Sequence, residues 1–361
     1  MLKVKTPKEY YCESGILSKS GEIISGFGRE AFVIAGKKAY DSVKDILEKS
    51  LKDEHIGFSL NIMEGYPTYD KVKAYSIASY EKKADIIIGI GGGKICDTAK
   101  GVANMRNIPV VMIPTVAGTC ACWAARSILY TDDGNFDRAL WNENNPDIII
   151  ADTDILKNSP KRYLAAGILD TLAKWYEFEP LIERDKKDVV LRQDVAIAKL
   201  AFDILEELGL KAYRGEADDD ELRQVLDAIF FLAGASGSFA NGKAYRGFAH
   251  SYYYASTRIK ESRYLLHGEK VAFGLLVQFV LKEKPAEYIY KFIKDLKNYE
   301  ITDIPGDWSK GNPEITKETV EKIAGLIIEE SPIVVEKGLV RDEAQCANAI
   351  ERASKLLDSA R

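Results

Sequence analysis

The first part of the chain alternates short apolar runs with segments of helical spacing. We predict strands over 32–35 and 55–65, and three further strands over 84–94, 107–115 and 145–153. The last three are continuous β-branched runs bounded by turn residues, as expected for strands buried on both faces of a parallel sheet. Between the runs, apolar residues recur at helical spacing, at Val43, Ile46, Leu47 and Leu51 and again over 71–83. This alternation predicts an open α/β domain with a parallel sheet.

From about Asn158 onward, strand-like runs give way to long amphipathic segments. In the segment 194–209, one helical face carries apolar residues and Gly209 supplies a stop signal: Ile197, Leu200, Ala201, Ile204, Leu205 and Leu208. Similar patterns cover 221–235, 270–283, 319–330 and 344–360. We therefore expect an α/β domain over 1–157 and an all-helical domain over 158–361, with a cofactor and substrate meeting in the cleft between them.

Composition narrows the class of protein. The 361 residues favour two domains, and the formal net charge of −5, with no basic run, argues against nucleic acid as a partner. No apolar run approaches the roughly 20 residues of a membrane helix, and the opening residues lack a signal-peptide core. Five cysteines without a C-x-x-C pair fit a reducing compartment. These features predict a cytoplasmic, enzyme-sized protein with no membrane partner.

A glycine-rich turn, Gly91–Gly93, joins a buried strand to a helix that starts near Lys94. Backbone amides at such a helix start favour a phosphate, although the turn could also serve only to reverse the chain. A Walker A loop is excluded because Ile95 stands where Ser or Thr is needed and Ile88 where Gly is needed. The Rossmann G-x-G-x-x-G pattern fails because Lys94 occupies its last glycine position.

The chain has three histidines, His55, His250 and His267. His55 lies in a polar stretch and is predicted to be a solvated surface residue. His250 and His267 are too far apart for two ligands on one helical turn, so a shared metal would be bound from two elements. Asp170 lies in an otherwise small and apolar helical stretch, where a lone carboxylate is costly to bury unless it is paired or metal-bound. An aspartate with two imidazoles suits zinc or ferrous iron, but spacing alone favours three unrelated residues.

Six segments carry motifs in a consistent order, and together they establish a resemblance. They are GGGKICDTAK (91–100), PT with SILYT (114–131), NPDIIIADT (145–153), AGILD (166–170), GFAH (247–250) and HGEKVAFG (267–274). In these residues the chain resembles the iron-containing alcohol dehydrogenase superfamily, and within it the glycerol dehydrogenase group, over nearly its whole length. The fold implied is dehydroquinate synthase-like, with an α/β nucleotide-binding domain and a helical metal-binding domain.

The resemblance implies a metal site and a reaction. Asp170, His250 and His267 would hold one divalent metal, zinc or iron, and act in catalysis through it. The implied reaction is hydride transfer between NAD(P) and the CH–OH or C=O group of a small polyol or hydroxy acid, with the metal as Lewis acid. A homo-oligomer is also implied.

The resemblance further implies which residues bind the cofactor. The pyrophosphate turn would contribute Gly91, Gly92, Gly93, Lys94 and Asp97. Thr115 and Tyr130 would lie along the cofactor.

Two departures from the glycerol dehydrogenase pattern bear on the substrate. Cys120 stands where these enzymes typically carry an aspartate near the polyol, and Arg126 stands where they usually carry leucine. Cys120 is more simply a small pocket-lining residue than a reactive thiol. Arg126 suits a substrate carboxylate or a cofactor phosphate, and a solvent-facing position is equally consistent with the sequence. Both departures favour an alternative function, a 2-oxo acid (hydroxycarboxylate) reductase on the same scaffold.

The third departure concerns NAD against NADP. An acidic residue at the end of the first strand would bind the ribose 2′-hydroxyl and disfavour a 2′-phosphate. Here Gly36 is followed by Lys37 and Lys38, which slightly favours NADP.

An alternative of another class is a metal- and NAD-using carbon–oxygen lyase of the dehydroquinate synthase type. Such a lyase needs several cations to bind the phosphate and carboxylate of its substrate. The segments around His250 and His267 offer Lys243, Arg246, Arg258, Lys260 and Lys270. The motifs AGILD and HGEKVAFG favour the dehydrogenase.

Overall fold

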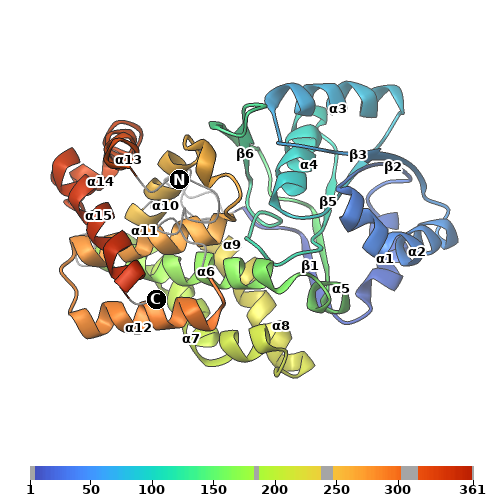
Figure 1. The fold of residues 1–361 in the computed structure, drawn as a ribbon. Helices are drawn as coiled ribbons and strands as arrows, with labels where there is room; N and C mark the ends of the chain where they lie inside the picture. The colour runs from blue at the N-terminus through green and yellow to red at the C-terminus, as the bar shows by residue number, and fades with distance from the viewer. Residues whose placement is uncertain (1–4, 183–186, 237–246, 302–315, 360–361) are drawn as a thin grey trace.

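The computed structural model describes residues 5–182, 187–236, 247–301 and 316–359, and it shows two halves side by side (Figure 1). One half contains the sheet and the helices on its two faces. The other half is built from helices alone, as the sequence predicted.

All six strands of the main sheet are parallel, in the order β1-β8-β5-β4-β2-β3. Their bounds are Glu9–Glu13 (β1), Glu30–Ala35 (β2), Gly57–Ile62 (β3), Ile86–Ile90 (β4), Val110–Ile113 (β5) and Ile148–Asp152 (β8). The five runs predicted as strands are confirmed. Sequence patterning missed the edge strand β1 and a separate antiparallel hairpin of β6 (Arg126–Tyr130) and β7 (Phe136–Trp141).

Helices cover both faces of this sheet, which explains its uninterrupted apolar strands. They are α1 (Ser20–Ser25), α2 (Lys37–Asp53), α3 (Tyr69–Glu81), α4 (Gly93–Arg106) and α5 (Thr153–Lys157), with a 3₁₀ turn η1 (Ile16–Lys19). In β4, Ile86, Ile88 and Ile90 belong to the core that includes Val43 and Leu47 of α2. Ile87 points to the opposite core, which includes Val102 of α4 and continues into the helical half. Because helices cover both faces, no side chain of the strand faces solvent, and apolar residues do not alternate with polar ones.

The helical half packs around α11, which is buried along most of its length. Its elements are α6 (Lys161–Ile182), α7 (Val189–Arg214), α8 (Asp219–Asp227), η2 (Ala228–Leu232), α9 (Ala233–Ala235), α10 (Phe248–Ser256), η3 (Lys260–Ser262), α11 (His267–Leu281), α12 (Ala286–Asn298), α13 (Lys317–Glu330), α14 (Ile333–Glu336) and α15 (Glu343–Ser359). Figure 1 shows α6 and α11 running between the outer helices and the sheet half. Among the described residues, no helix has the length and apolar character needed to cross a membrane.

The prediction that Gly209 ends its helix is wrong. Helix α7 runs on to Arg214, and Gly215, at φ 77°, caps it in the left-handed region that glycine tolerates. Gly209 lies inside this helix and packs closely on Tyr299. A Cβ at position 209 would come within 2.9 Å of the Tyr299 hydroxyl, which explains why the residue is a glycine. The expected apolar face is also partly wrong, since Leu200 is 52% exposed.

Candidate active site

Three predicted ligands come together from three different helices. The Asp170 carboxylate of α6 lies 3.0 Å from Nε2 of His267, at the start of α11, and 3.2 Å from Nε2 of His250, in α10. One ligand atom from each residue lies within 4.8 Å of the others. A carboxylate oxygen and two imidazole nitrogens converging on one point form a donor set for zinc or iron. The three residues therefore fit the metal that the resemblance implies, whereas His55 is exposed on the surface, as predicted.

Glycines let the helices of this site approach closely. A Cβ on Gly167, three residues before Asp170, would lie 2.0 Å from the carbonyl oxygen of Ala117, in the loop after β5. A Cβ on Gly268, next to His267, would lie 1.8 Å from the carbonyl oxygen of Ala166. The glycines of AGILD and HGEKVAFG thus have a packing role, because any larger residue would push the ligands apart.

Glu177, which the sequence analysis missed, orients His250. Its Oε2 lies 2.5 Å from Nδ1 of His250, and its Oε1 accepts a hydrogen bond of 2.9 Å from the His250 backbone amide. A carboxylate on Nδ1 fixes the ring so that Nε2 faces Asp170, which is how proteins commonly orient a metal-binding imidazole. The signal was present in the sequence, since Glu177 follows Asp170 by seven residues on the same helical face.

His267 is held in place by an ion pair at the start of α11. Glu269 accepts hydrogen bonds from Nε and Nη2 of Arg162, on α6, at 2.5 and 2.7 Å. Oε2 of this carboxylate, which accepts from Nη2, also accepts from the Leu266 amide at 2.8 Å, and this bond caps the first turn of α11. The buried Glu269 thereby ties the helix that carries His267 to the helix that carries Asp170.

Neighbouring groups favour the charged forms of Asp170 and His250. Burial alone would raise the pKa of Asp170, but the imidazoles of His267 and His250 hold that pKa well below its ordinary value. Burial alone would lower the pKa of His250, but Glu177 and Asp170 raise it to about 10. Asp170 and His250 therefore attract each other as opposite charges, an arrangement that a bound cation would replace.

The glycine-rich turn lies at the carboxyl end of β4, where open α/β sheets bind ligands. Helix α4 begins at Gly93, so the turn presents the first amides of that helix. A Cβ on Gly92 would lie 2.9 Å from Val116, and a Cβ on Gly93 would lie 3.4 Å from Thr119. The turn and the loop after β5 are thus packed against each other. Gly91 continues the sheet by donating its amide to Ile113 at 3.1 Å.

Asp97 and Lys100 form a buried pair inside α4. Nζ of Lys100 lies 3.0 Å from the Asp97 carboxylate. The same ammonium donates to the carbonyls of Ala121, Ala124 and Arg126, at 2.7, 3.0 and 2.5 Å. Burial raises the pKa of Asp97, although Lys100 opposes the shift. This pair clamps the loop that leads into β6, so the structure places Asp97 behind that loop.

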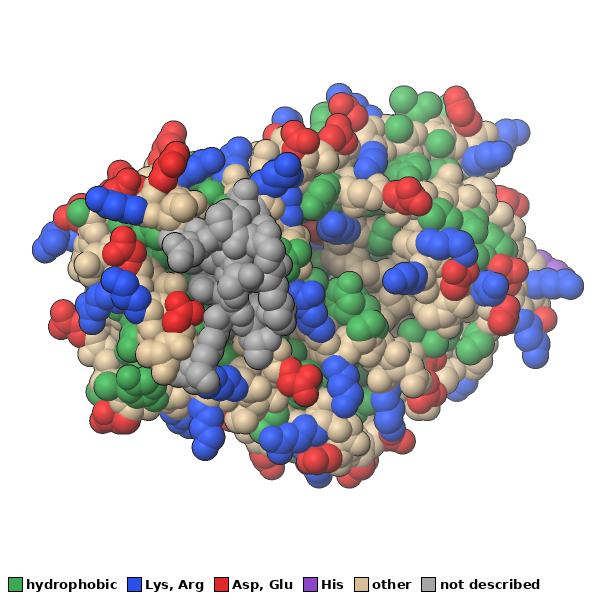
Figure 2. All heavy atoms as spheres, in the orientation of Figure 1, with side chains coloured by type: hydrophobic (Ala, Val, Ile, Leu, Met, Phe, Trp, Pro, Cys, Tyr) green, Lys and Arg blue, Asp and Glu red, His purple; other side chains and the backbone are tan. Residues whose placement is uncertain are grey.

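Aromatic side chains connect the two halves. The hydroxyl of Tyr130, on β6, lies 2.6 Å from the hydroxyl of Tyr253, on α10. The Tyr253 ring lies 4.0 Å from the His267 ring, centroid to centroid. Nζ of Lys94 lies 3.9 Å from the centre of the Tyr66 ring, which in turn packs on Tyr130. The line of rings leads from the glycine-rich turn to the metal ligands, and Figure 2 shows that the face between the two halves is hollowed and bordered by Lys and Arg side chains.

The remaining predicted residues lie around this line. Thr115 is buried just beyond β5, while Cys120 and Arg126 are half-buried in and after the clamped loop. At the end of β2, Lys37 is engaged by Asp41 at 2.6 Å, and Lys38 is exposed.

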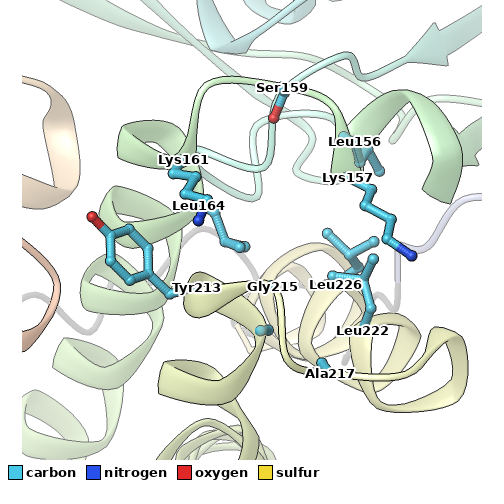
Figure 3. A pocket seen from close by; sticks show the side chains of 11 residues that line it. Leu156, Lys157, Ser159, Lys161, Leu164, Tyr213, Gly215, Ala217, Leu222 and Leu226 are labelled. Carbon is cyan, nitrogen blue, oxygen red and sulfur yellow. The ribbon is translucent and has the colours of Figure 1, made fainter.

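A separate pocket lies away from these residues, between α5–α6 and α7–α8 (Figure 3). Leu164, Leu222 and Leu226 line it, with Lys157 and Lys161 at its border. None of the three metal ligands contributes to it.

Comparison with known proteins agrees with this geometry. Residues 7–153 match the family model "Iron-containing alcohol dehydrogenase". The chain is 32% identical over 293 residues to a glycerol dehydrogenase of Escherichia coli O6:H1, with 79% of each chain covered. It is 34% identical over 203 residues to hydroxycarboxylate dehydrogenase A of Escherichia coli K12, covering 54% of this chain and 55% of that protein.

Among solved structures, a probable glycerol dehydrogenase from Sinorhizobium meliloti superposes with a TM-score of 0.86 at 23% identity. That comparison covers 99% of this chain and 100% of the other, and it shows the same fold. The parallel sheet, the helical half, the convergent ligands and the sequence identity lead to one conclusion: the chain belongs to the iron-containing alcohol dehydrogenase family, whose members are metal-dependent NAD(P)-linked enzymes.

Proposed function

We propose that the protein transfers a hydride between NAD(P) and the CH–OH or C=O group of a small polyol or hydroxy acid, with a divalent metal at Asp170, His250 and His267. The observation that carries this proposal is the convergence of the three ligand atoms within 4.8 Å, with Glu177 fixing His250 from behind. We further propose that residues 1–157 bind the dinucleotide and that residues 158–361 hold the metal. The homo-oligomer implied by the resemblance and the cytoplasmic location predicted from composition remain predictions.

In this proposal, a bound metal supplies Lewis-acid polarisation of the substrate oxygen and the nicotinamide supplies or accepts the hydride. In the reducing direction, the carbonyl carbon gains the hydride with its electron pair, the oxygen gains a proton, and NAD(P)H becomes NAD(P)⁺. Asp170, His250 and His267 would hold the metal that binds the substrate oxygen. Tyr253 packs beside His267 and limits the movement of its ring.

We propose that the cofactor binds along the glycine-rich turn. The first amides of α4, at Gly93 and Lys94, are free to receive a phosphate because a helix start leaves them without acceptors in the helix. Gly91, Gly92, Thr115 and Tyr130 border the same path. The structure offers Asp97 a positioning role, through Lys100 and the loop that it clamps. NADP stays slightly favoured over NAD, on Lys38 alone, since Lys37 is paired with Asp41.

A 2-oxo acid reductase is the second candidate function. Arg126 emerges from the clamped loop, and one relative carries the name hydroxycarboxylate dehydrogenase A. The lyase alternative loses support because Arg258 pairs with Glu330 at 2.9 Å. Two of its other candidate cations, Lys243 and Arg246, lie outside the described residues.

The proposal is tested by following NADH and NADPH oxidation with added zinc or ferrous iron. Dihydroxyacetone, 2-oxobutyrate and 2-oxoglutarate serve as substrates. We expect turnover that disappears in an Asp170→Asn, His267→Ala double variant and persists in His55→Asn, a matched change at an exposed histidine. Turnover that survives in the double variant, or its absence from every combination, would refute metal-dependent hydride transfer.

A further inference from the structure

Helix α6 presents a stripe of three charged residues toward the metal ligands. Asp170, Lys174 and Glu177 lie at positions i, i+4 and i+7, which share one helical face. Asp170 lies 3.2 Å from Nε2 of His250, and Glu177 lies 2.5 Å from Nδ1 of the same ring. Because the residues on either side of it both face His250, Lys174 lies on the face that borders the active site.

Arg126 approaches the same place from the sheet half. Its carbonyl is held by Lys100 at 2.5 Å, and the loop before it packs on α6 through the contact of Ala117 with Gly167. The pKa of Arg126 is raised by Tyr254 first and then by Cys120, Asp97 and Asp170, all of which therefore lie near its guanidinium. Two elements of different halves thus bring a guanidinium and an ammonium within electrostatic reach of Asp170.

Lys174 has some of the same electrostatic neighbours as Arg126. Burial alone would lower its pKa, but Cys120 and Asp170 raise it, while Arg126 opposes them. Cys120 therefore lies near both cations, where it contributes a thiol and no carboxylate.

Within residues 5–182, 187–236, 247–301 and 316–359, neither Arg126 nor Lys174 has a hydrogen bond or an ion pair from its side chain. The Arg126 guanidinium lies 5.6 Å from the centre of the Trp141 ring, and no carboxylate lies within ion-pair distance of it. Lys174 has an acidic neighbour on α7, Asp194, but burial raises the pKa of Asp194 to about 7 despite Lys174. A carboxyl group with a pKa of about 7 is only partly ionised at neutral pH, so Asp194 offsets the charge of Lys174 only in part.

The other acidic groups nearby are already engaged. Asp170 faces two imidazoles, Glu177 binds His250, and Asp97 is paired with Lys100. A divalent ion would offset the charges of Asp170 and Glu177. The two cations would then have only the partly ionised Asp194 as a counter-charge in the described part of the protein, and desolvated cations without a full counter-charge are costly. An anionic ligand would remove that cost.

We propose that Arg126 and Lys174 together bind a carboxylate of the substrate, which makes the substrate a 2-oxo acid in reduction and a 2-hydroxy acid in oxidation. This inference rests on the hydride transfer proposed above and selects the acid over the polyol. The balanced reaction is 2-oxo acid plus NAD(P)H plus H⁺ giving 2-hydroxy acid plus NAD(P)⁺. The hydride adds to C2 and the carboxylate keeps its charge throughout.

The spacing along α6 places the carboxylate next to the reacting carbon. One turn of an α-helix, about 5.4 Å, separates Asp170 from Lys174. This short separation suits a substrate whose carboxylate is attached directly to the carbonyl carbon, with the carbonyl oxygen toward the Asp170 cluster and the carboxylate toward Lys174. Arg126 adds a planar guanidinium that can bind a carboxylate through two parallel hydrogen bonds.

The test compares two substrates of equal carbon skeleton, 2-oxobutyrate and 1-hydroxybutan-2-one. They differ in having a carboxylate or a neutral CH₂OH beside the carbonyl. In the parent protein, loaded with zinc or iron, we expect kcat/KM to favour the acid. In Lys174→Met and in Arg126→Met, the ratio of kcat/KM for acid over neutral ketone should fall about 10- to 100-fold, mostly through KM, since a hydrogen bond to a charged group is worth about 1.5 to 3 kcal/mol.

Two further variants separate charge from folding. Lys174→Arg and Arg126→Lys keep the positive charge and should recover part of the ratio. Lys294→Met, at an exposed lysine of α12 that forms no ion pair with any described residue, is the matched control and should leave the ratio unchanged.

A binding measurement without turnover decides the inference even if catalysis fails. The non-reducible oxamate should raise the thermal unfolding midpoint of the metal-loaded parent, and Lys174→Met should lose most of that shift. Absence of turnover with a Lys174-dependent oxamate shift would refute the proposed hydride transfer and support the carboxylate site. Equal losses for both substrates, a preference for the neutral ketone, or an oxamate shift that both Met variants retain would overturn the carboxylate site.

Discussion

Two buried ionic clusters lie on the two sides of the cleft, and they differ in whether their charges are satisfied. In the sheet half, the ammonium of Lys100 is bound by Asp97 and by three backbone carbonyls. In the helical half, Lys174 lies beside Asp170 on α6 with no bound partner among the described residues. A lysine with all its donors used stabilises the protein, whereas one with its donors open can bind a ligand. Position in the sequence does not distinguish them, because both follow an aspartate on a helix by three or four residues.

Matched substitutions of these two lysines would break the comparison most directly. Lys100→Met leaves Asp97 and three carbonyls buried without their partner, and should lower the free energy of unfolding by about 3 to 5 kcal/mol. Lys174→Met removes a charge that has no bound partner, and should change the free energy of unfolding by about 1 kcal/mol or less. Urea denaturation of both variants, with Lys294→Met as control, measures the difference. Equal destabilisation by the two changes would show that Lys174 is a structural residue.

Glu177 offers the next largest effect, on metal affinity. Glu177→Gln keeps the size of the side chain but removes the charge that orients His250, so metal affinity should fall about 10- to 100-fold. Competition with a chromophoric chelator measures the affinity directly. The control is Glu318→Gln, the same change at an exposed position in helix α13. Unchanged affinity in Glu177→Gln would mean that the helices alone orient the ring.

Asp194 gives a smaller, pH-dependent effect. Neither of its carboxylate oxygens has a hydrogen-bond partner, and burial raises its pKa to about 7, above the ordinary value of 3.8. The folded state therefore binds this proton more tightly than the unfolded state, so stability should fall as pH rises from about 4 to 7. The slope should be at most about 1.4 kcal/mol per pH unit. Asp194→Asn should remove it, whereas Asp45→Asn, at an exposed site, should retain it; denaturation midpoints that are identical at pH 5 and pH 8 in the parent would contradict this assignment.

The sheet half was predictable because its signal is local. A strand covered on both faces must be apolar throughout, so β4 and β8 stand out in the sequence. The edge strand β1 is only partly buried and carries tyrosines and glutamates, which obscures its pattern. Gly209 was misinterpreted because its reason is a contact with Tyr299, far away in sequence.

The site was predictable only in part. Asp170, His250 and His267 lie on three helices, so their spacing carries no metal signature, and the motifs of the family were needed to connect them. Glu177 and Lys174 were missed although they continue the stripe from Asp170 at helical spacing. A charged stripe on an otherwise apolar helix is a signal that a sequence can show, but its partner on α10 appears only in the fold.

The central claim is that Asp170, His250 and His267 hold one metal ion per chain. Its most direct test is elemental analysis of the protein after saturation with zinc or ferrous iron and removal of free metal. The account predicts one equivalent per chain in the parent and in Lys174→Met, and none in the Asp170→Asn, His267→Ala double variant. A parent that retains no metal, or a double variant that retains a full equivalent, would contradict it.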